Sequence, residues 1–315
     1  MSKVFITDYM EDHTLEKSIL GEYLSSKPSN NIEVLMVFKK KIDEKYISNF
    51  PKLRAVIQYG VGYDNNDLEL LKNNDIMLCN TPDYGTSEVA DTTFSMIINI
   101  IRGVFKYDYN ARFFESGTWQ SNTIKKIKRT SDVKLGVIGA GNIGGSVLIR
   151  ANSIGIKTYF YDPYVKSGYD KLLNSVRLDS LEKLLSMCDV ISINTPLTVE
   201  TKGMVNDAFI SKMKKGSSIV LTARGEIIDD LNTIYNALKS EHIDSCALDV
   251  LPQEPPTDSK LINAWKVQEK WLGGRLIINP HTAFYSDKSI IEMKKKAALN
   301  ALRIIEDKSP LNRIV

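Results

Sequence analysis

The sequence predicts an α/β protein made of two Rossmann-like or flavodoxin-like parallel-sheet domains, with an active-site cleft between them. Short apolar runs rich in β-branched residues alternate with segments of helical spacing along most of the chain, which is the pattern of a parallel sheet covered by helices. A G-x-G-x-x-G turn spans residues 139–144. The length of 315 residues is enough for two domains of ordinary size.

The composition is typical of a globular protein, with 43% hydrophobic and 25% charged residues. The 41 basic and 38 acidic residues nearly balance, so we expect neither nucleic acid nor a membrane surface as a partner. No apolar run approaches the ~20 residues that a membrane span needs. The three cysteines, Cys79, Cys188 and Cys246, suit neither a disulfide framework nor a zinc site. We therefore expect a cytoplasmic protein with reduced thiols and no metal.

The first domain, expected to bind the substrate, is predicted to comprise residues 1–102 and 286–315. Its predicted strands lie at 4–7, 34–38, 55–58 and 76–79, and its predicted helices at 15–24, 42–50, 68–73, 88–102 and 289–307. The first strand is not followed by a phosphate-binding turn, which favours a substrate-holding role. Hinges are expected near residues 102–103 and 285–286. Next, Phe105, Tyr109 and Phe113 form an apolar stripe at helical spacing, which fits either the core or a subunit interface.

The second domain, expected over residues 103–285, repeats strand and helix as a doubly wound nucleotide-binding fold does. Its predicted strands lie at 134–138, 157–161, 190–194, 218–222, 247–250 and 276–279, and its predicted helices at 142–153, 180–187, 207–213 and 231–240. Short strands and intervening helices together predict a parallel sheet.

The glycine turn in this domain predicts dinucleotide binding. Gly139 permits the tight turn, Gly141 lets a pyrophosphate approach the backbone, and Gly144 lets the helix pack closely on the strand. The helix that begins with Asn142 and Ile143 offers free N–H groups and a positive dipole to phosphate.

Asp162 follows the next strand, at a spacing expected for a carboxylate that holds the adenosine ribose hydroxyls. No arginine follows it to receive a 2′-phosphate. The predicted cofactor is therefore NAD rather than NADP.

Polar residues follow the other strands of this domain, where ligands bind in an open parallel sheet. His281 is the one histidine of three with this position, and it is a candidate acid/base because histidine exchanges protons near neutral pH. Arg224 can hold a carboxylate through a bidentate fork. Asp249 ends a strand and Glu254 lies in the proline-rich loop 251–256, and a carboxylate paired with His281 would orient the ring and favour its protonated form.

Together these residues resemble the D-isomer-specific 2-hydroxyacid dehydrogenase family over nearly the whole chain. The resemblance is carried by Tyr59–Asn65, the glycine turn with Asp162, Thr222–Gly225, Ala247–Val250 with Glu254, and Pro280–Ala283. Within the family, residues 160–164 and 283–286 are similar to the C-terminal-binding proteins and their bacterial relatives.

The resemblance implies a role for each matching residue. It implies that Arg224 binds the substrate carboxylate, that His281 is the acid/base and that Glu254 is its partner. It further implies cofactor contacts for Thr195, Pro196, Thr201, Thr222, Ala223 and Asp249, with Asp249 on the nicotinamide amide, and a carboxylate contact for the backbone N–H groups of Val61 and Gly62. The implied reaction is reversible hydride transfer between NADH and a small 2-oxo acid, with a homodimer as the expected assembly.

Two positions depart from the C-terminal-binding proteins, which carry an arginine at Gln58 and a tryptophan at Phe284. Both departures bear on the choice of substrate rather than on the reaction. A NAD(H)-sensing dimer with weak turnover is an alternative, as is a dehydrogenase of the D-3-phosphoglycerate or hydroxypyruvate type. Formate oxidation is disfavoured because it needs no proton-transfer pair.

Overall fold

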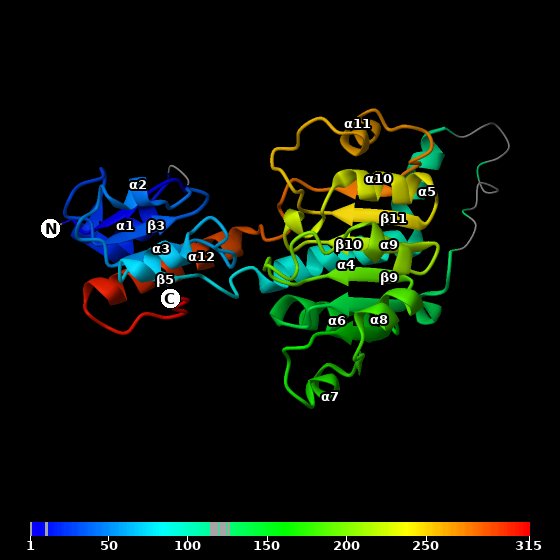
Figure 1. Cartoon of the computed structure of the whole chain (residues 1–315), viewed down its shortest axis with the longest axis horizontal. Helices are drawn as coiled ribbons and strands as arrows, with labels where there is room; N and C mark the ends of the chain where they lie inside the picture. Colours follow the sequence, from blue (N-terminus) through cyan, green and yellow to red (C-terminus); the bar gives the residue numbers. More distant parts are fainter. Residues whose placement is uncertain (1, 10–11, 114–118, 120–123, 125–126) are drawn as a thin grey trace. The chain divides into compact units, whose positions relative to one another are not determined.

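The computed structural model describes residues 2–9, 12–113, 119, 124 and 127–315. Its contacts divide the chain into two compact units, which Figure 1 shows in the colours of the sequence. The first unit comprises Met1–Thr86 and Tyr285–Val315, and the second unit comprises Ser87–Phe284. Each unit is an α/β fold around one parallel sheet, as predicted.

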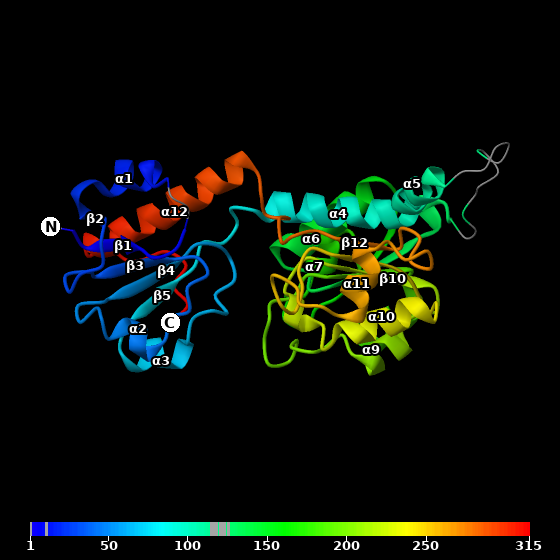
Figure 2. The ribbon, with the colours of Figure 1, turned by 90° about the horizontal axis from the view of Figure 1, so that it is seen from above.

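The sheet of the first unit has the strand order β2-β1-β3-β4-β5, which is the flavodoxin-like order, and all its strand pairs are parallel. The strands are β1 (Val4–Ile6), β2 (Leu24–Ser25), β3 (Val34–Val37), β4 (Ala55–Gln58) and β5 (Met77–Cys79). The helices are α1 (Thr14–Leu20), α2 (Glu44–Ile47), α3 (Leu68–Asn73) and α12 (Asp287–Ile305), with a 3₁₀ turn η1 (Gly21–Tyr23). Helices α1 and α12 cover one face of the sheet, and α2 and α3 cover the other (Figure 2).

Local chemistry sets the ends of these helices. The Asp67 side chain accepts a hydrogen bond from the backbone N–H of Leu70 at 3.0 Å and so caps α3, which has the predicted bounds. The predicted helix 15–24 instead ends at Leu20, because Gly21 adopts φ +54° and Leu24 pairs with β1. The predicted helix 42–50 is also shorter, because Ile42 forms a bridge with Asn66.

A buried ion pair joins α1 to α12. Glu16 is fully buried, and its carboxylate lies 3.2 Å from Nζ of Lys294, which also donates to the carbonyl oxygen of Asp12. The hydroxyl of Tyr59 donates to the other Glu16 oxygen at 3.0 Å. Burial, followed by the neighbouring Glu16 charge, raises the pKa of Tyr59 well above its usual value, so this phenol stays a neutral donor.

The second unit has a seven-stranded parallel sheet in the order β12-β11-β10-β9-β6-β7-β8, so the strand order reverses between β6 and β9. The strands are β6 (Lys134–Ile138), β7 (Lys157–Tyr161), β8 (Val176–Arg177), β9 (Val190–Ile193), β10 (Ser217–Leu221), β11 (Ile243–Leu248) and β12 (Leu276–Ile278). The helices are α4 (Thr86–Arg102), α5 (Val104–Arg112), α6 (Asn142–Ser153), α7 (Tyr169–Leu173), α8 (Leu181–Met187), α9 (Asp207–Lys212), α10 (Leu231–Lys239) and α11 (Lys260–Lys266), with 3₁₀ turns η2 (Thr130–Asp132) and η3 (Gly225–Ile227).

Two apolar clusters cover the two faces of this sheet. One cluster joins α4 and α6 to the sheet through residues such as Ile97 and Val147, and the other joins α8, α9 and α10 to it through residues such as Leu184 and Ile234. The short elements α7, β8 and α11 were not predicted. Helix α7 and strand β8 have five or fewer residues, and α11 has seven and follows a loop rich in proline and polar residues, so none of them shows a clear hydrophobic periodicity.

The boundary of the first unit lies at residue 86, earlier than the predicted boundary at residue 102. Helix α4 buries Ala90, Met96, Ile97 and Ile101 in the same cluster as the strands of the second unit. Its apolar face therefore ties it to that unit, although its sequence reads equally well as the last helix of the first. The return point lies at Tyr285, close to the predicted hinge.

The aromatic stripe lies on α5 and the residue that follows it. Phe105 and Phe113 are 44% and 66% exposed, and the Tyr109 and Phe113 rings are 5.1 Å apart. The stripe is therefore not part of the apolar core of the second unit. Within the part of the chain that the structure describes, no helix combines the length and apolar character needed to cross a membrane.

We predict that Lys294→Met lowers the free energy of unfolding by about 3–5 kcal/mol, because it leaves the Glu16 carboxylate buried without its cation. Urea denaturation would measure the change. The neighbouring Lys295 is exposed, so Lys295→Met is the matched control and should change stability by less than about 0.5 kcal/mol. Equal stability of the two variants would contradict a structural role for the buried pair.

Candidate active site

Six strands of the second unit end level with one another at the carboxyl edge of the sheet. The strand register places Tyr161, Ile138, Ile193, Leu221, Leu248 and Ile278 in a single row across the sheet. The residues that follow them, Asp162, Gly139, Asn194, Thr222, Asp249 and Asn279, therefore start their loops side by side. Most of the predicted site residues of this unit belong to these loops.

The glycine turn between β6 and α6 depends on two of its three glycines for its shape. Gly139 adopts φ +83°, and a Cβ there would lie 2.9 Å from the carbonyl oxygen of Asn194. A Cβ at Gly144 would lie 1.9 Å from the carbonyl oxygen of Gly139. By contrast, a Cβ at Gly141 would meet no atom within 4 Å, so the space in front of this residue is open.

Asn142 and Ile143 form the first turn of α6, where the N–H groups have no acceptor within the helix. Both residues are at least partly exposed. An anion placed before Gly141 would meet these N–H groups and the positive end of the helix dipole.

Asp162 holds the loop after β7 in place. One carboxylate oxygen accepts from the N–H of Ala140 at 2.9 Å, and the other accepts from the N–H of Tyr164 at 2.9 Å. The Tyr164 hydroxyl donates to Glu200 at 2.5 Å, which ties this loop to the loop after β9. Glu200, through its hydrogen bond and then its charge, raises the pKa of Tyr164. Neither Tyr164 nor Glu200 was predicted as a site residue.

The loop after β9 carries the predicted adenosine-side residues. Thr201 stabilises it, since its hydroxyl donates to the carbonyl oxygen of Pro196 at 2.6 Å and accepts from the N–H of Thr198 at 2.8 Å. Two buried side-chain oxygens at its base, Thr195 Oγ1 and Asn194 Oδ1, have no hydrogen-bond partner. Buried polar atoms without partners are costly, so they indicate that a polar ligand completes this edge. With the open space at Gly141, they fit a dinucleotide.

His281 and Glu254 form the predicted pair. Nδ1 of His281 lies 2.7 Å from Oε2 of Glu254, and Oε1 of Glu254 accepts from the N–H of Leu251 at 3.0 Å. With Glu254 ionised, Nδ1 carries the donated proton and Nε2 is the nitrogen available for proton exchange with a ligand. His281 also adopts φ +56°, a conformation that is uncommon for a residue with a side chain and is frequent at functional sites.

Asp249 supports the loop that carries His281. Its carboxylate is 1% exposed and accepts hydrogen bonds from the N–H groups of Thr282 and Ala283 at 3.1–3.2 Å, while its carbonyl oxygen accepts from the N–H of His281 at 2.8 Å. Burial raises the pKa of Asp249, and the bonds from Ala283 and Thr282 oppose that rise. This role was not predicted. The contact with the nicotinamide amide stays a prediction.

Arg224 follows Thr222 and Ala223 at the end of β10. Its guanidinium donates to the carbonyl oxygen of Ala223 at 2.9 Å, and the Thr222 hydroxyl lies 2.7 Å from that of Thr93 on α4. A Cβ on the next residue, Gly225, would lie 1.9 Å from the carbonyl of Leu251. The turn that carries Arg224 therefore packs against the backbone that orients Glu254, a contact that only glycine permits.

The predicted carboxylate loop lies in the first unit, directly after β4. Val61 is 44% exposed, and the carbonyl oxygens of Gly60 and Val61 accept hydrogen bonds from Thr81 N–H and the Asn80 side chain. Gln58, where the resemblance expects an arginine, is 2% exposed, and its amide is bonded to Asn66 and to the Phe38 carbonyl oxygen.

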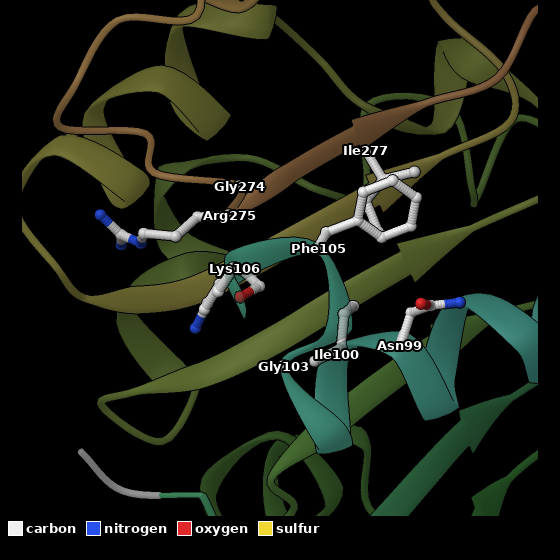
Figure 3. Close-up of a pocket in the computed structure, with 9 residues that line it drawn as sticks. Asn99, Ile100, Gly103, Phe105, Lys106, Gly274, Arg275 and Ile277 are labelled. Atoms are coloured by element: carbon white, nitrogen blue, oxygen red, sulfur yellow. The ribbon is translucent and has the colours of Figure 1, made fainter. Parts of the chain in front are cut away.

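A small cavity of about 10 Å³ in the second unit lies away from these residues. It is lined by residues of α4, α5, β11 and the segment before β12, including Phe105, Lys106 and Arg275 (Figure 3). It has room for about one water molecule and is too small for a nucleotide or an organic acid. Among the described residues, no group of three or more histidine, cysteine, aspartate and glutamate side chains could hold a metal ion.

Comparisons with known proteins agree with this arrangement. Residues 94–283 match the family model described as "D-isomer specific 2-hydroxyacid dehydrogenase, NAD binding domain". A glyoxylate reductase of Korarchaeum cryptofilum is 32% identical over 277 residues, 87% of this chain and 79% of that protein. A D-3-phosphoglycerate dehydrogenase of Bacillus subtilis is 30% identical over 273 residues, 84% of this chain and 51% of that protein. The structure is similar to that of a D-lactate dehydrogenase of Aquifex aeolicus complexed with NAD and lactic acid, with a TM-score of 0.83 and 27% identity over 97% of this chain and 96% of that chain.

The two contrasting glycines give a test of the dinucleotide edge. Gly141→Ala should leave the free energy of unfolding unchanged but weaken NADH binding about tenfold or more, because the added methyl group occupies the space through which phosphate reaches the N–H groups. Gly144→Ala should instead destabilise the protein by about 1–3 kcal/mol or more, because its Cβ overlaps the Gly139 carbonyl. NADH fluorescence titration and urea denaturation would measure the two effects. Unchanged NADH affinity in Gly141→Ala would contradict the phosphate assignment.

Proposed function

The chain belongs to the D-isomer-specific 2-hydroxyacid dehydrogenase family, and from this premise we propose how its residues carry out reversible hydride transfer between NADH and a small 2-oxo acid. It is an NAD-dependent oxidoreductase that acts on the CH–OH group of its donor. The observation that carries the proposal is the 2.7 Å contact between Nδ1 of His281 and Glu254, at the edge that also bears the glycine turn.

We assign the cofactor to the strand ends of the second unit. Gly139, Gly141, Asn142, Ile143 and Gly144 would hold the pyrophosphate. Asp162 would hold the adenosine ribose, and Thr195, Pro196, Thr201, Thr222, Ala223 and Asp249 would line the remaining surface. Bound NADH supplies the hydride.

The substrate carboxylate would bind to Arg224 and to the N–H groups of Val61 and Gly62. Protonated His281, oriented by Glu254, gives a proton from Nε2 to the carbonyl oxygen during reduction. In the reverse direction, neutral His281 accepts the hydroxyl proton. Glu254 stabilises the imidazolium because its carboxylate lies beside the ring.

In this assignment the first unit binds the substrate and the second unit binds NAD. Gln58 and Phe284 stand where the C-terminal-binding proteins carry an arginine and a tryptophan, so we expect this protein to select a different substrate for the same reaction.

The principal alternative is a NAD(H)-sensing dimer with weak turnover. The complete set Arg224, Glu254 and His281 favours catalysis, because a sensor needs no proton-transfer pair. Assaying NADH oxidation with glyoxylate, pyruvate, hydroxypyruvate and 3-phosphohydroxypyruvate would separate the two, since a sensor would bind NADH but oxidise it only slowly with each of these acids. The same panel tests the phosphoglycerate and hydroxypyruvate alternatives.

We further propose a cytoplasmic homodimer. The exposed side chains of Val104, Phe105, Tyr107 and Phe113 on and next to α5 support an apolar contact with a second copy of the chain.

His281→Asn should lower kcat/KM for the 2-oxo acid by about 10²–10⁴-fold, because asparagine cannot supply the proton. Steady-state kinetics would measure the loss, and the NADH dissociation constant should stay the same. The His242 ring precedes β11, at the opposite end of that strand from the site residues, and its Nε2 lies 3.1 Å from the carbonyl oxygen of Met213. His242→Asn is therefore the matched control and should retain full activity. Equal turnover by the two variants would refute the assignment of His281.

Sedimentation equilibrium should give a molar mass twice that of the single chain. Phe113→Asp should shift the protein toward the monomer, because it places a charge on the apolar contact. Val267→Asp, at a position 72% exposed on the second unit, is the control and should leave the molar mass unchanged. A wild-type mass equal to that of one chain would contradict the homodimer.

A further inference from the structure

We propose that Asn80 and Thr81, at the end of β5, are positioning residues for the substrate carboxylate. They hold the peptide groups of the loop 60–62 so that the N–H groups of Val61 and Gly62 face the same way. The inference rests on the proposed function, which assigns the carboxylate to these N–H groups, and it adds the residues that aim them.

The loop after β4 is held by its carbonyl oxygens. Nδ2 of Asn80 donates to the carbonyl oxygen of Val61 at 2.8 Å. The N–H of Thr81 donates to the carbonyl oxygen of Gly60 at 2.9 Å, and its hydroxyl donates to that of Gln58 at 2.8 Å. Three carbonyl oxygens of one short segment are thus bonded to two adjacent residues.

These bonds determine where the N–H groups point. A trans peptide group is planar, so its N–H and C=O point in opposite directions. The peptide with the Gly60 carbonyl carries the Val61 N–H, and the peptide with the Val61 carbonyl carries the Gly62 N–H. Because both carbonyls face the end of β5, both N–H groups point away from it. Successive N–H groups with a shared direction form a concavity that binds anions.

The loop has the exposure and backbone shape that such a binding role needs. Gly60 adopts φ +110°, which a residue with a side chain rarely adopts. Val61 is 44% exposed and Gly62 is partly exposed, so the loop is accessible to a ligand. In contrast, Asn80 and Thr81 are 8% and 2% exposed. We therefore expect them to contact the loop but not the ligand.

The backbone of Asn80 is itself fixed by the last residues of the chain. Its N–H donates to the carbonyl oxygen of Asn312 at 3.2 Å, and the preceding residue, Cys79, forms an antiparallel bridge with Arg313. The N–H of Ile314 also donates to the carbonyl oxygen of Leu78 at 2.7 Å. A fixed backbone holds the Asn80 amide at a constant distance from Val61.

The direction of the Val61 and Gly62 N–H groups matters because residue 58 is a glutamine and supplies no positive charge to the substrate carboxylate. Oε1 of Gln58 accepts from Asn66 at 2.8 Å, and its Nε2 donates to the carbonyl oxygen of Phe38 at 2.7 Å. This side chain is therefore committed to the interior of the first unit. The carboxylate-binding capacity of the loop itself then rests on its peptide groups.

The test compares Asn80→Asp and Asn80→Ala with the wild type. The substrate is whichever of glyoxylate, pyruvate and hydroxypyruvate the wild type reduces best. Both variants remove the donor to Val61, and aspartate keeps the side-chain shape. We expect the KM for the acid and the inhibition constant of oxamate to rise about ten- to a hundredfold, the range for hydrogen bonds to charged groups. The kcat and the NADH dissociation constant should change less than about twofold.

Thr81→Val is the second variant, should the Asn80 variants fail to fold. It keeps the N–H bond to Gly60 and loses the hydroxyl bond to Gln58, so we expect a smaller rise in KM in the same direction. Asn74→Ala is the control, because its amide donates to the carbonyl oxygen of Leu70 at 2.8 Å in the same unit but away from the loop. Its KM should equal that of the wild type.

The outcomes separate the inference from the proposed function. If the wild type reduces none of the acids, the proposed function fails. If the wild type is active but KM and the oxamate constant stay unchanged in the folded variants, the positioning role is wrong while the function stands. A fall in kcat alone would also overturn the positioning role, since a lost carboxylate contact must weaken acid and inhibitor binding together.

Discussion

The arrangement of the second unit depends on one constraint, the register of its parallel strands. Six strands end on residues that pair across the sheet, from Tyr161 on β7 to Ile278 on β12. Their loops therefore begin in one row, and polar residues separated by more than a hundred positions share an edge. The strand order reverses at β6 and β9, where the loops diverge and leave room for a ligand.

Backbone groups, more than side-chain pairs, hold the polar residues of this edge in place. The carboxylates of Asp162, Asp249 and Glu254 each accept hydrogen bonds from main-chain N–H groups, either of their own loop or of a neighbouring one. Such bonds stabilise buried or half-buried carboxylates and fix their orientation. They also offset the unfavourable φ of His281. The carbonyl oxygen of Asp249 accepts from the N–H of His281, and its carboxylate accepts from the N–H groups of the two residues that follow.

In the first unit, hydrogen bonds hold main-chain carbonyl oxygens in place rather than side-chain carboxylates. There the carbonyl oxygens of the loop after β4 are bonded to Asn80 and Thr81, and the N–H groups are left facing outward. A binding surface made of peptide N–H groups needs no charged side chain, which is consistent with the interior bonding of Gln58. The buried pair of Glu16 and Lys294 joins the helices behind this sheet.

The sequence by itself determined the fold class and, to within two residues, the carboxyl ends of the predicted strands, because these follow from local periodicity and glycine spacing. Its motifs indicated the NAD cofactor and, by resemblance, the family. Helix α6 and strands β6 and β7 have their predicted bounds. The tertiary structure alone decided that α4 belongs to the second unit, since its apolar face could have packed on either sheet. It also decided that Asp249 holds the His281 loop, that Gly225 touches Leu251 and that Asn80 holds Val61. These contacts join residues distant in the chain, and no local pattern encodes which backbone group a distant side chain will meet.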